Sequence, residues 1–229
     1  MKKVIITATL LACLAFGASA ENGFEGRPIT TNIPMPTGFT LNRGEFLVGI
    51  GNIGFGISDR VQVGTNVLLY LLQDYNASLK ISFIKTENKA LALGFKVHRF
   101  DLEVYGAESG FTSFSPFAVF STRVSRDTFL HIGGQYSHFS GDEDIEDAAA
   151  TATSTGTSLS LGIEHCFSNR TKFLAETGYD ATFEGFRFGG AVLWGWKSFR
   201  LKLGGKYFKP KGTGGFISPV ISLWWRFNG

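Results

Sequence analysis

Cysteine, proline and long hydrophobic runs are all scarce in this sequence. Only 2 of its 229 residues are cysteine, and proline is scarce, with 6 residues. After the first 20 residues, the longest purely hydrophobic run is Val67 to Leu72, far shorter than the roughly 18 to 20 residues that span a membrane as a helix. If this chain crosses a membrane, we therefore expect it to cross with strands.

A strong charge of one sign is also missing. The formal net charge is only +3, which argues against a broad basic surface for nucleic acid. Lys2 and Lys3 precede an apolar stretch that ends in Ala18-Ser19-Ala20, the order found in secretory signal peptides. We expect residues 1–20 to be removed, leaving residues 21–229 as a single domain.

The cysteines limit the chemistry of the exported chain. Cys13 offers a lipoprotein cleavage site as an alternative, but the apolar stretch continues past it to a good Ala-x-Ala site. With the leader removed only Cys166 remains, so an intramolecular disulfide and a cysteine-based zinc site are both excluded. We predict no cofactor and no metal.

What the sequence does contain is alternation with a period of two residues. From Leu91 to Val97 the odd positions are large and apolar, whereas the even positions hold small or polar residues. Similar stretches recur along the chain and indicate strands with one apolar face. The opposite face is rich in glycine and carries charges in mid-strand, as expected where the apolar face meets lipid and the polar face lines a lumen. Aromatic residues near the expected strand ends fit the girdles at the two bilayer interfaces: Tyr70, Tyr179, Trp194, Trp196, Tyr207, Trp225 and Phe227. The predicted fold is an all-β, transmembrane, antiparallel up-and-down β-barrel.

The end of the chain carries a resemblance. Leu223, Trp225 and Phe227 alternate almost to the terminus, which resembles the last strand of bacterial outer-membrane β-barrel proteins. Asn228 and Gly229 depart from the usual terminal aromatic residue. The segment from Gly44 to Arg60 also looks like a strand and short turn of that broad class. The resemblance implies an outer-membrane location and recognition of the last strand by the barrel assembly machinery.

Turn residues divide the chain into strands. Short connections are expected at residues 58–60, 86–88, 125–127, 168–170 and 197–198, and further connections at 73–75, 99–113, 140–155, 184–185 and 209–215. Eleven strands follow from this map, and Ile29 to Leu41 is the candidate for a twelfth, although Pro34 and Pro36 weaken it. We predict twelve strands, with ten as the alternative if the first segment lies inside the lumen or the Gln73 hairpin is misread.

The face opposite the apolar one supplies the candidate functional residues. We expect these charged side chains to line the lumen: Lys80, Lys96, Arg123, Glu164, Glu176, Asp180, Arg187, Lys197, Arg200, Lys202, Lys206 and Arg226. Glu45, His98, His131 and Lys172 fall on the same predicted face. Two interpretations stay open: a hydrated pore with a charged wall, or charges that pair across strands and close the interior.

Two loop features suggest other activities. His138 and Ser140 stand two residues apart, which resembles the His-x-Ser pair of outer-membrane lipid A deacylases and implies a carboxylate from Glu143 or Glu146. Five carboxylates between Asp142 and Asp147 could attract calcium, but a solvated loop is favoured because the glycine-centred spacing of an EF-hand is absent.

The sequence therefore predicts a small porin-like passive channel or a structural membrane component, and not an enzyme. The alternatives are a lipid hydrolase using His138 and Ser140, or a surface-interaction protein acting through loops 101–113 and 140–155. The expected partners are outer-membrane lipid, lipopolysaccharide and the assembly machinery, with no nucleic acid; a protein partner is unknown.

Overall fold

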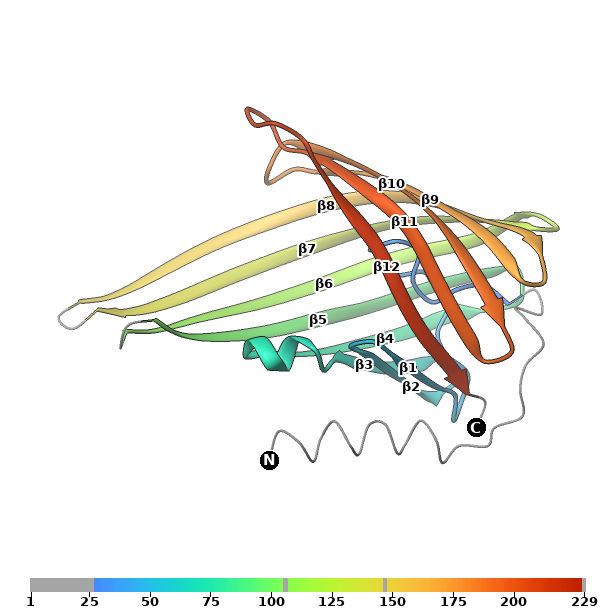
Figure 1. Ribbon diagram of the computed structural model, residues 1–229, viewed down its shortest axis with the longest axis horizontal. Helices are drawn as coiled ribbons and strands as arrows, with labels where there is room; N and C mark the ends of the chain where they lie inside the picture. Colours follow the sequence, from blue (N-terminus) through green and yellow to red (C-terminus); the bar gives the residue numbers. More distant parts are fainter. Residues whose placement is uncertain (1–26, 105–106, 146–147, 228–229) are drawn as a thin grey trace.

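The computed structural model describes residues 27–104, 107–145 and 148–227, with the side chains of 102–109 and 142–152 left out. In this part of the chain, twelve antiparallel strands form one closed barrel in which each strand pairs with the next and β1 pairs with β12 (Figure 1). The predicted fold class and strand number are confirmed. The strands are β1 (Phe46–Gly49), β2 (Asn52–Ser58), β3 (Val61–Asn66), β4 (Asp74–Lys85), β5 (Lys89–Val104), β6 (Ala107–Ser125), β7 (Thr128–Ile145), β8 (Ala148–Ser168), β9 (Thr171–Asp180), β10 (Gly185–Trp196), β11 (Phe199–Lys209) and β12 (Phe216–Phe227). A short 3-10 helix, η1 (Leu69–Leu72), lies between β3 and β4.

Alternation along each strand sorts side chains between the two surfaces of the wall. In β10, Leu193 is buried inside the barrel, whereas Val192 and Trp194 are 47% and 41% exposed on the outside. Similar outward exposure of large apolar residues recurs around the barrel. Among the described residues, no helix is long and apolar enough to cross a membrane.

The strands differ greatly in length. β1, β2 and β3 have 4, 7 and 6 residues, whereas β5 to β8 have 16 to 21. The expected loops 99–113 and 140–155 were wrong, because most of these residues extend the strands. Val104 pairs with Ala107, and Ile145 pairs with Ala148. Paired extension satisfies the backbone N–H and C=O groups of these polar segments.

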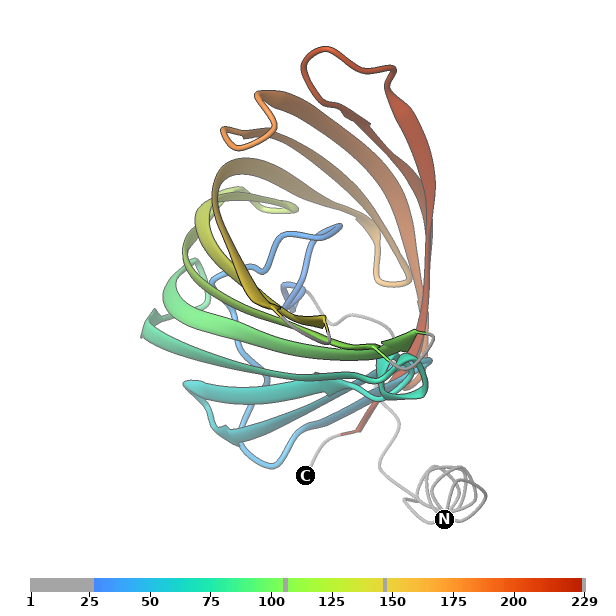
Figure 2. The same ribbon diagram turned by 90° about the vertical axis from the view of Figure 1, so that its left-hand side faces the viewer.

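The expected strand Ile29 to Leu41 is also wrong. Residues 27–45, called the inner segment from here on, run inside the ring of strands (Figure 2). Pro34 and Pro36 lack the N–H that a ladder strand donates, and the chain instead doubles back through a bridge between Thr31 and Pro36. The first segment thus lies in the lumen, as the ten-strand alternative supposed. The barrel still has twelve strands because residues 46–58 form two strands, joined at Ile50 and Gly51.

The packed core lies between the inner segment and the inner wall. Ile29 and Ile33 contact Leu174, Ala191 and Leu193. Phe39 meets the ring of Phe129 edge to face, with centroids 5.4 Å apart, and Met35 packs in a further apolar cluster. The apolar residues of the inner segment therefore fill the barrel and do not face lipid.

Candidate functional site: a lumen crossed by the inner segment

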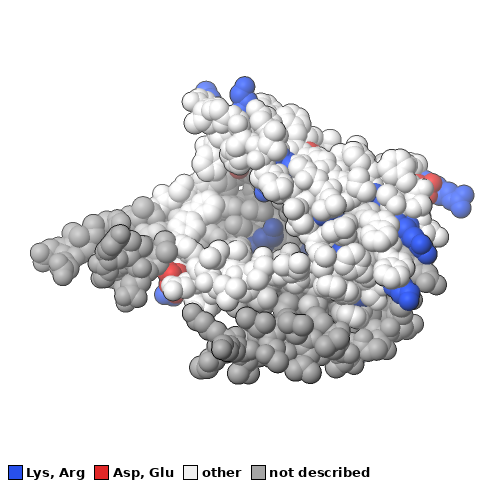
Figure 3. Space-filling view, in the orientation of Figure 1, with Lys and Arg blue, Asp and Glu red and all other residues white. Residues whose placement is uncertain are grey.

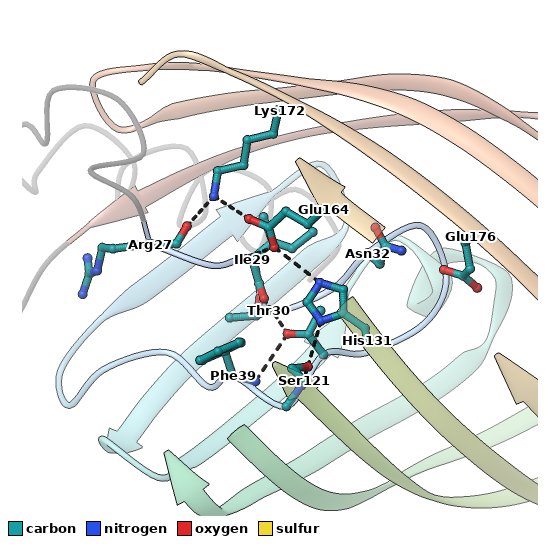
Figure 4. A network of polar contacts seen from close by, with 12 residues as sticks. Arg27, Ile29, Thr30, Asn32, Phe39, Ser121, His131, Glu164, Lys172 and Glu176 are labelled. Carbon is teal, nitrogen blue, oxygen red and sulfur yellow. Dashed lines mark hydrogen bonds and ion pairs between the residues drawn. The ribbon is translucent and has the colours of Figure 1, made fainter. Parts of the chain in front are cut away.

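A buried ionic cluster ties the start of the inner segment to the wall. Lys172 on β9 places its Nζ atom 2.6 Å from a Glu164 oxygen, and the other oxygen lies 3.5 Å from His131 Nε2 (Figure 4). All three side chains are fully buried. Glu164 also accepts the N–H of Ile29 at 3.1 Å, and His131 Nδ1 lies 2.8 Å from the Ser121 hydroxyl. The carboxylate is thus shared between the wall and the inner segment, which satisfies a charge that burial alone would disfavour.

Lys80 on β4 holds the middle of the inner segment. Its Nζ atom lies 2.9 Å, 3.3 Å and 2.6 Å from the carbonyl oxygens of Thr30, Thr37 and Phe39. An ammonium group has three donors, and all three are directed at the backbone of the inner segment. The chain therefore folds around this side chain.

The hairpin of the inner segment is held from the other side of the barrel. Glu176 on β9 accepts the N–H groups of Ile33 and Met35, each at 3.2 Å. Lys202 on β11 donates to the carbonyl oxygen of Asn32. The carboxylate of Glu176 therefore accepts the free N–H groups of this turn, and the ammonium of Lys202 donates to one of its carbonyl groups. Both contacts satisfy backbone groups that would otherwise be buried without partners.

A third set of charges lies where the barrel closes. Glu45 directly precedes β1 and is paired with Arg226 of β12 through two contacts, one of them 3.0 Å long, while Arg27 approaches to 3.5 Å. Burial would raise the pKa of Glu45, but the bonds and charge of Arg226, together with Arg27, hold that pKa below its ordinary value. The first and last strands are thereby linked by an ionised carboxylate.

Of the sequence-predicted lumen residues, Lys197 lies in a turn and Asp180 lies at the end of a strand, next to a turn, whereas the others lie within the wall. Lys197 is a correction: it lies in the β10–β11 turn with φ 52°, is exposed, and places its ammonium 5.5 Å from the Trp196 ring. A two-residue turn needs a left-handed residue there, so the side chain leaves the wall. Asp180, at the end of β9, lines a cavity together with Glu176 and Arg187, and it also accepts the N–H groups of Thr182 and Phe183 in the β9–β10 turn. The structure places the others along the inner face of the wall: Lys80, Lys96, Arg123, Glu164, Glu176, Arg187, Arg200, Lys202, Lys206 and Arg226.

The sequence reasoning missed the partners of these charges. In the inner segment, Asn32 accepts a bond from Lys202 and Thr37 accepts one from Lys80. Gly38 of the same segment bonds two uncharged wall residues, donating its N–H to Ser121 and accepting from Ser82. The two prolines of the first segment were the available signal, because they are poorly suited to a ladder strand.

The interior retains space beside the inner segment. The largest cavity has a volume of about 370 Å³, within the range of small-molecule sites. Two smaller cavities of about 230 and 200 Å³ lie against Pro34 and Arg187. The largest one is lined by basic side chains and by no Asp or Glu among the described residues: Arg27, Lys96, Arg200, Lys202 and Arg226.

The His-x-Ser pair lies away from this interior. His138 is exposed and alternates with the inward residues of β7, which places it on the outer face beside Tyr136, and Ser140 falls on the same face. The side chain of Glu143 and the whole of Glu146 lie outside the described residues. A hydrolytic triad there stays a sequence-level hypothesis.

These features define the class of protein. A closed antiparallel barrel with large apolar side chains outside and polar side chains inside is a transmembrane β-barrel of the bacterial outer-membrane type. The outward row of β12 contains Leu223, Trp225 and Phe227, the residues of the C-terminal resemblance. Recognition of these residues by the barrel assembly machinery stays a prediction.

Comparison with known proteins gives structural likenesses only. No protein-family model and no curated protein matches the chain. The solved structures that it resembles include the KdgM porin in complex with disordered oligogalacturonate, with a TM-score of 0.49, 10% identity, and coverage of 81% of this chain and 96% of that one. Ail, the attachment invasion locus protein of Yersinia pestis, has a TM-score of 0.36 and 13% identity, with coverage of 80% of this chain and 99% of that one. The NanC porin has a TM-score of 0.37 and 8% identity, with coverage of 81% of this chain and 98% of that one.

Proposed function

We propose that the protein is an outer-membrane barrel whose inner segment obstructs the axial passage, so that the intact chain conducts ions weakly. The observation that carries this proposal is the bonding of Lys80, whose ammonium is satisfied by three carbonyl groups of the inner segment. A segment held in this way does not leave the lumen without breaking these three bonds to the buried ammonium.

The anchors come from different sides of the barrel. Lys80 belongs to β4, Glu164 to β8, Glu176 to β9 and Lys202 to β11, and each contacts the backbone of the inner segment. The segment is therefore suspended across the lumen. Its apolar side chains fill the space between these anchors, which supports a structural or gated role over free diffusion.

A passive channel remains the second candidate. The observation that favours it is the basic cavity of about 370 Å³ beside the inner segment, which would attract small anions if it were continuous with water at both ends. The two candidates differ in what the intact chain does in a bilayer.

Single-channel recording in planar bilayers separates them. The wild-type protein is compared with a chain lacking residues 28–41, and heat-modifiable gel migration verifies that each forms a folded barrel. We expect weak or absent conductance from the wild type and stable ohmic steps from the shortened chain. Wild-type steps as large and as frequent as those of the shortened chain would overturn the proposal.

A point variant tests directly whether the bonds of Lys80 hold the inner segment in place. Lys80→Met removes the anchoring ammonium while keeping an unbranched side chain, and we expect more frequent openings. Lys89→Met is the matched control, since Lys89 is exposed at the start of β5. Equal behaviour of the two variants would show that the bonds of Lys80 do not hold the lumen closed.

A further inference from the structure

The barrel wall is incomplete beside β12. Only the last part of β12 pairs with β1, from Trp224 to Phe227, and the final bond runs from the Ile50 N–H to the Leu223 carbonyl at 2.9 Å. Residues 216–222 pair with β11 on their other side. Along that stretch, β12 has an edge without a neighbouring strand among the described residues.

Pro219 fits this free edge. The Leu223 carbonyl points towards β1, and alternate residues of a strand direct their backbone groups to the same side. Pro219, four residues earlier in an unshifted register, therefore directs its nitrogen to the free edge, where the missing N–H breaks no ladder bond. Proline in this position also opposes pairing with another strand.

On the opposite side of the opening, the barrel wall is formed by the short strand β1. β1 has 4 residues, which span about 14 Å at the rise of an antiparallel strand, against an apolar band about 25 Å tall in outer-membrane barrels. Above it, Ile50, Leu71 and Leu72 are 65%, 64% and 63% exposed. Turn residues of this apolar kind suit hydrocarbon better than water, so the opening lies at the depth of the membrane. We call this opening, between the free edge of β12 and the β1–β2 turn with η1, the side notch.

The notch leads into the largest cavity. Ile53 and Leu223 occupy outward positions of their strands, whereas Ile33 and Lys202 lie inside, yet all four line the same cavity. The space-filling view shows a hollow beside β12 with basic side chains visible within it (Figure 3). The cavity therefore extends from the lumen to the parts of β2 and β12 that flank the notch.

The two ends of this passage differ in chemistry. Its outer end is apolar, with Ile50, Ile53 and Leu223. At its inner end, Lys202 lies 5.6 Å from the Trp224 ring and Lys96 and Arg200 line the same cavity. Basic groups gathered in a cleft with low-dielectric walls attract an anion.

We propose that the side notch is a lateral portal through which an amphiphile with an anionic head and one acyl chain enters from the bilayer. The head contacts Lys202 and its basic neighbours, while the chain leaves between β12 and the β1–β2 turn into lipid. Charge complementarity selects the head, and the apolar outer end selects the chain. The portal opens to the side, so it does not depend on whether the barrel axis conducts.

Photocrosslinking in proteoliposomes tests the route. Palmitate carrying a diazirine near its carboxylate is compared with the equivalent uncharged hexadecanol, and adducts are mapped by mass spectrometry. We expect palmitate adducts on peptides covering 27–54 and 216–227, and few from hexadecanol. Adducts spread evenly over the outer face, or equal labelling by both probes, would overturn the proposal.

Binding of radiolabelled palmitate to the detergent-solubilised barrel tests the head site. Lys202→Met is expected to weaken affinity about tenfold or more, as loss of one charge-assisted contact implies. Lys206→Met is the matched control, because it lies four residues along the same face of β11 but outside this cavity. Ser222→Trp obstructs the passage without removing a charge. We expect it to lower the palmitate affinity by a factor similar to that of Lys202→Met. Unchanged palmitate affinity in both Lys202→Met and Ser222→Trp would rule the portal out.

Discussion

Glu45 and Arg226 form a two-contact ion pair where the first and last strands of the barrel meet. The carboxylate is 1% exposed and the guanidinium 13%. β1 and β12 share only the four residue pairs from Phe46 and Phe227 to Gly49 and Trp224. With so short a ladder, we expect closure of the barrel to depend on this side-chain pair.

Replacing Glu45 by glutamine should therefore loosen the seam. It leaves Arg226 largely buried beside a neutral group, and breaking a buried pair costs on the order of 3 kcal/mol. Urea unfolding in detergent micelles measures the change. A variant with wild-type unfolding free energy would show that the short ladder alone closes the barrel.

The same pair predicts a pH dependence. Because the pKa of Glu45 is lowered in the folded barrel, its contribution is complete above the ordinary value of 4.5 and is lost as pH falls through the folded value. The difference in unfolding free energy between wild type and Glu45→Gln should shrink on acidification below that range. A difference that stays constant from neutral pH to pH of about 3 would contradict the ionised pair.

The cluster of Glu164 and Lys172 should show strong coupling. Either Glu164→Gln or Lys172→Met leaves a partner charge buried, at a cost of roughly 3 to 5 kcal/mol. The double variant should cost less than the sum of the two single changes, since neither charge is then stranded. Urea unfolding of all four proteins completes the cycle, and additive effects would mean that the two groups do not interact.

Two glycines give a matched test of the inner segment. A Cβ at Gly56 would lie 1.9 Å from the Asn42 carbonyl oxygen, whereas a Cβ at Gly190 meets nothing within 4 Å. Gly56→Ala should destabilise the barrel by about 1 to 3 kcal/mol through overpacking, and Gly190→Ala should be close to neutral. Thermal unfolding followed by gel mobility measures both, and equal stabilities would place the inner segment away from β2.

The outer surface is tested at Val192, in the middle of β10. An arginine there should cost about 2 to 4 kcal/mol if this face meets the bilayer core. Leu201, near the end of β11, gives a milder comparison, because the cost falls to about 0 to 1 kcal/mol near the interface. Unfolding from lipid vesicles compares the two arginine variants. Full tolerance at Val192 would argue against contact with lipid.

The alternation of the sequence was sufficient to predict the barrel. In a stretch such as Leu91 to Val97, each residue type depends on which surface of the wall it faces, so the fold is visible within a few residues. The outward row of Leu223, Trp225 and Phe227 follows from the same rule. The short hairpin at Ile50 and Gly51 was harder to detect, because strands of 4 and 7 residues contain too few alternations.

The contents of the lumen could not be predicted in this way. Ile29, Ile33 and Phe39 have the same character as lipid-facing residues, yet they pack against the inner wall, and local sequence does not separate the two environments. Lys80 is buried against the inner segment, and its partners lie 41 to 50 residues away in the chain. A strand-built barrel with a charged interior follows from the alternation alone. The inner segment that the charges hold, and the unpaired edge of β12, are visible only in the folded chain, because both depend on which residues distant in sequence come into contact.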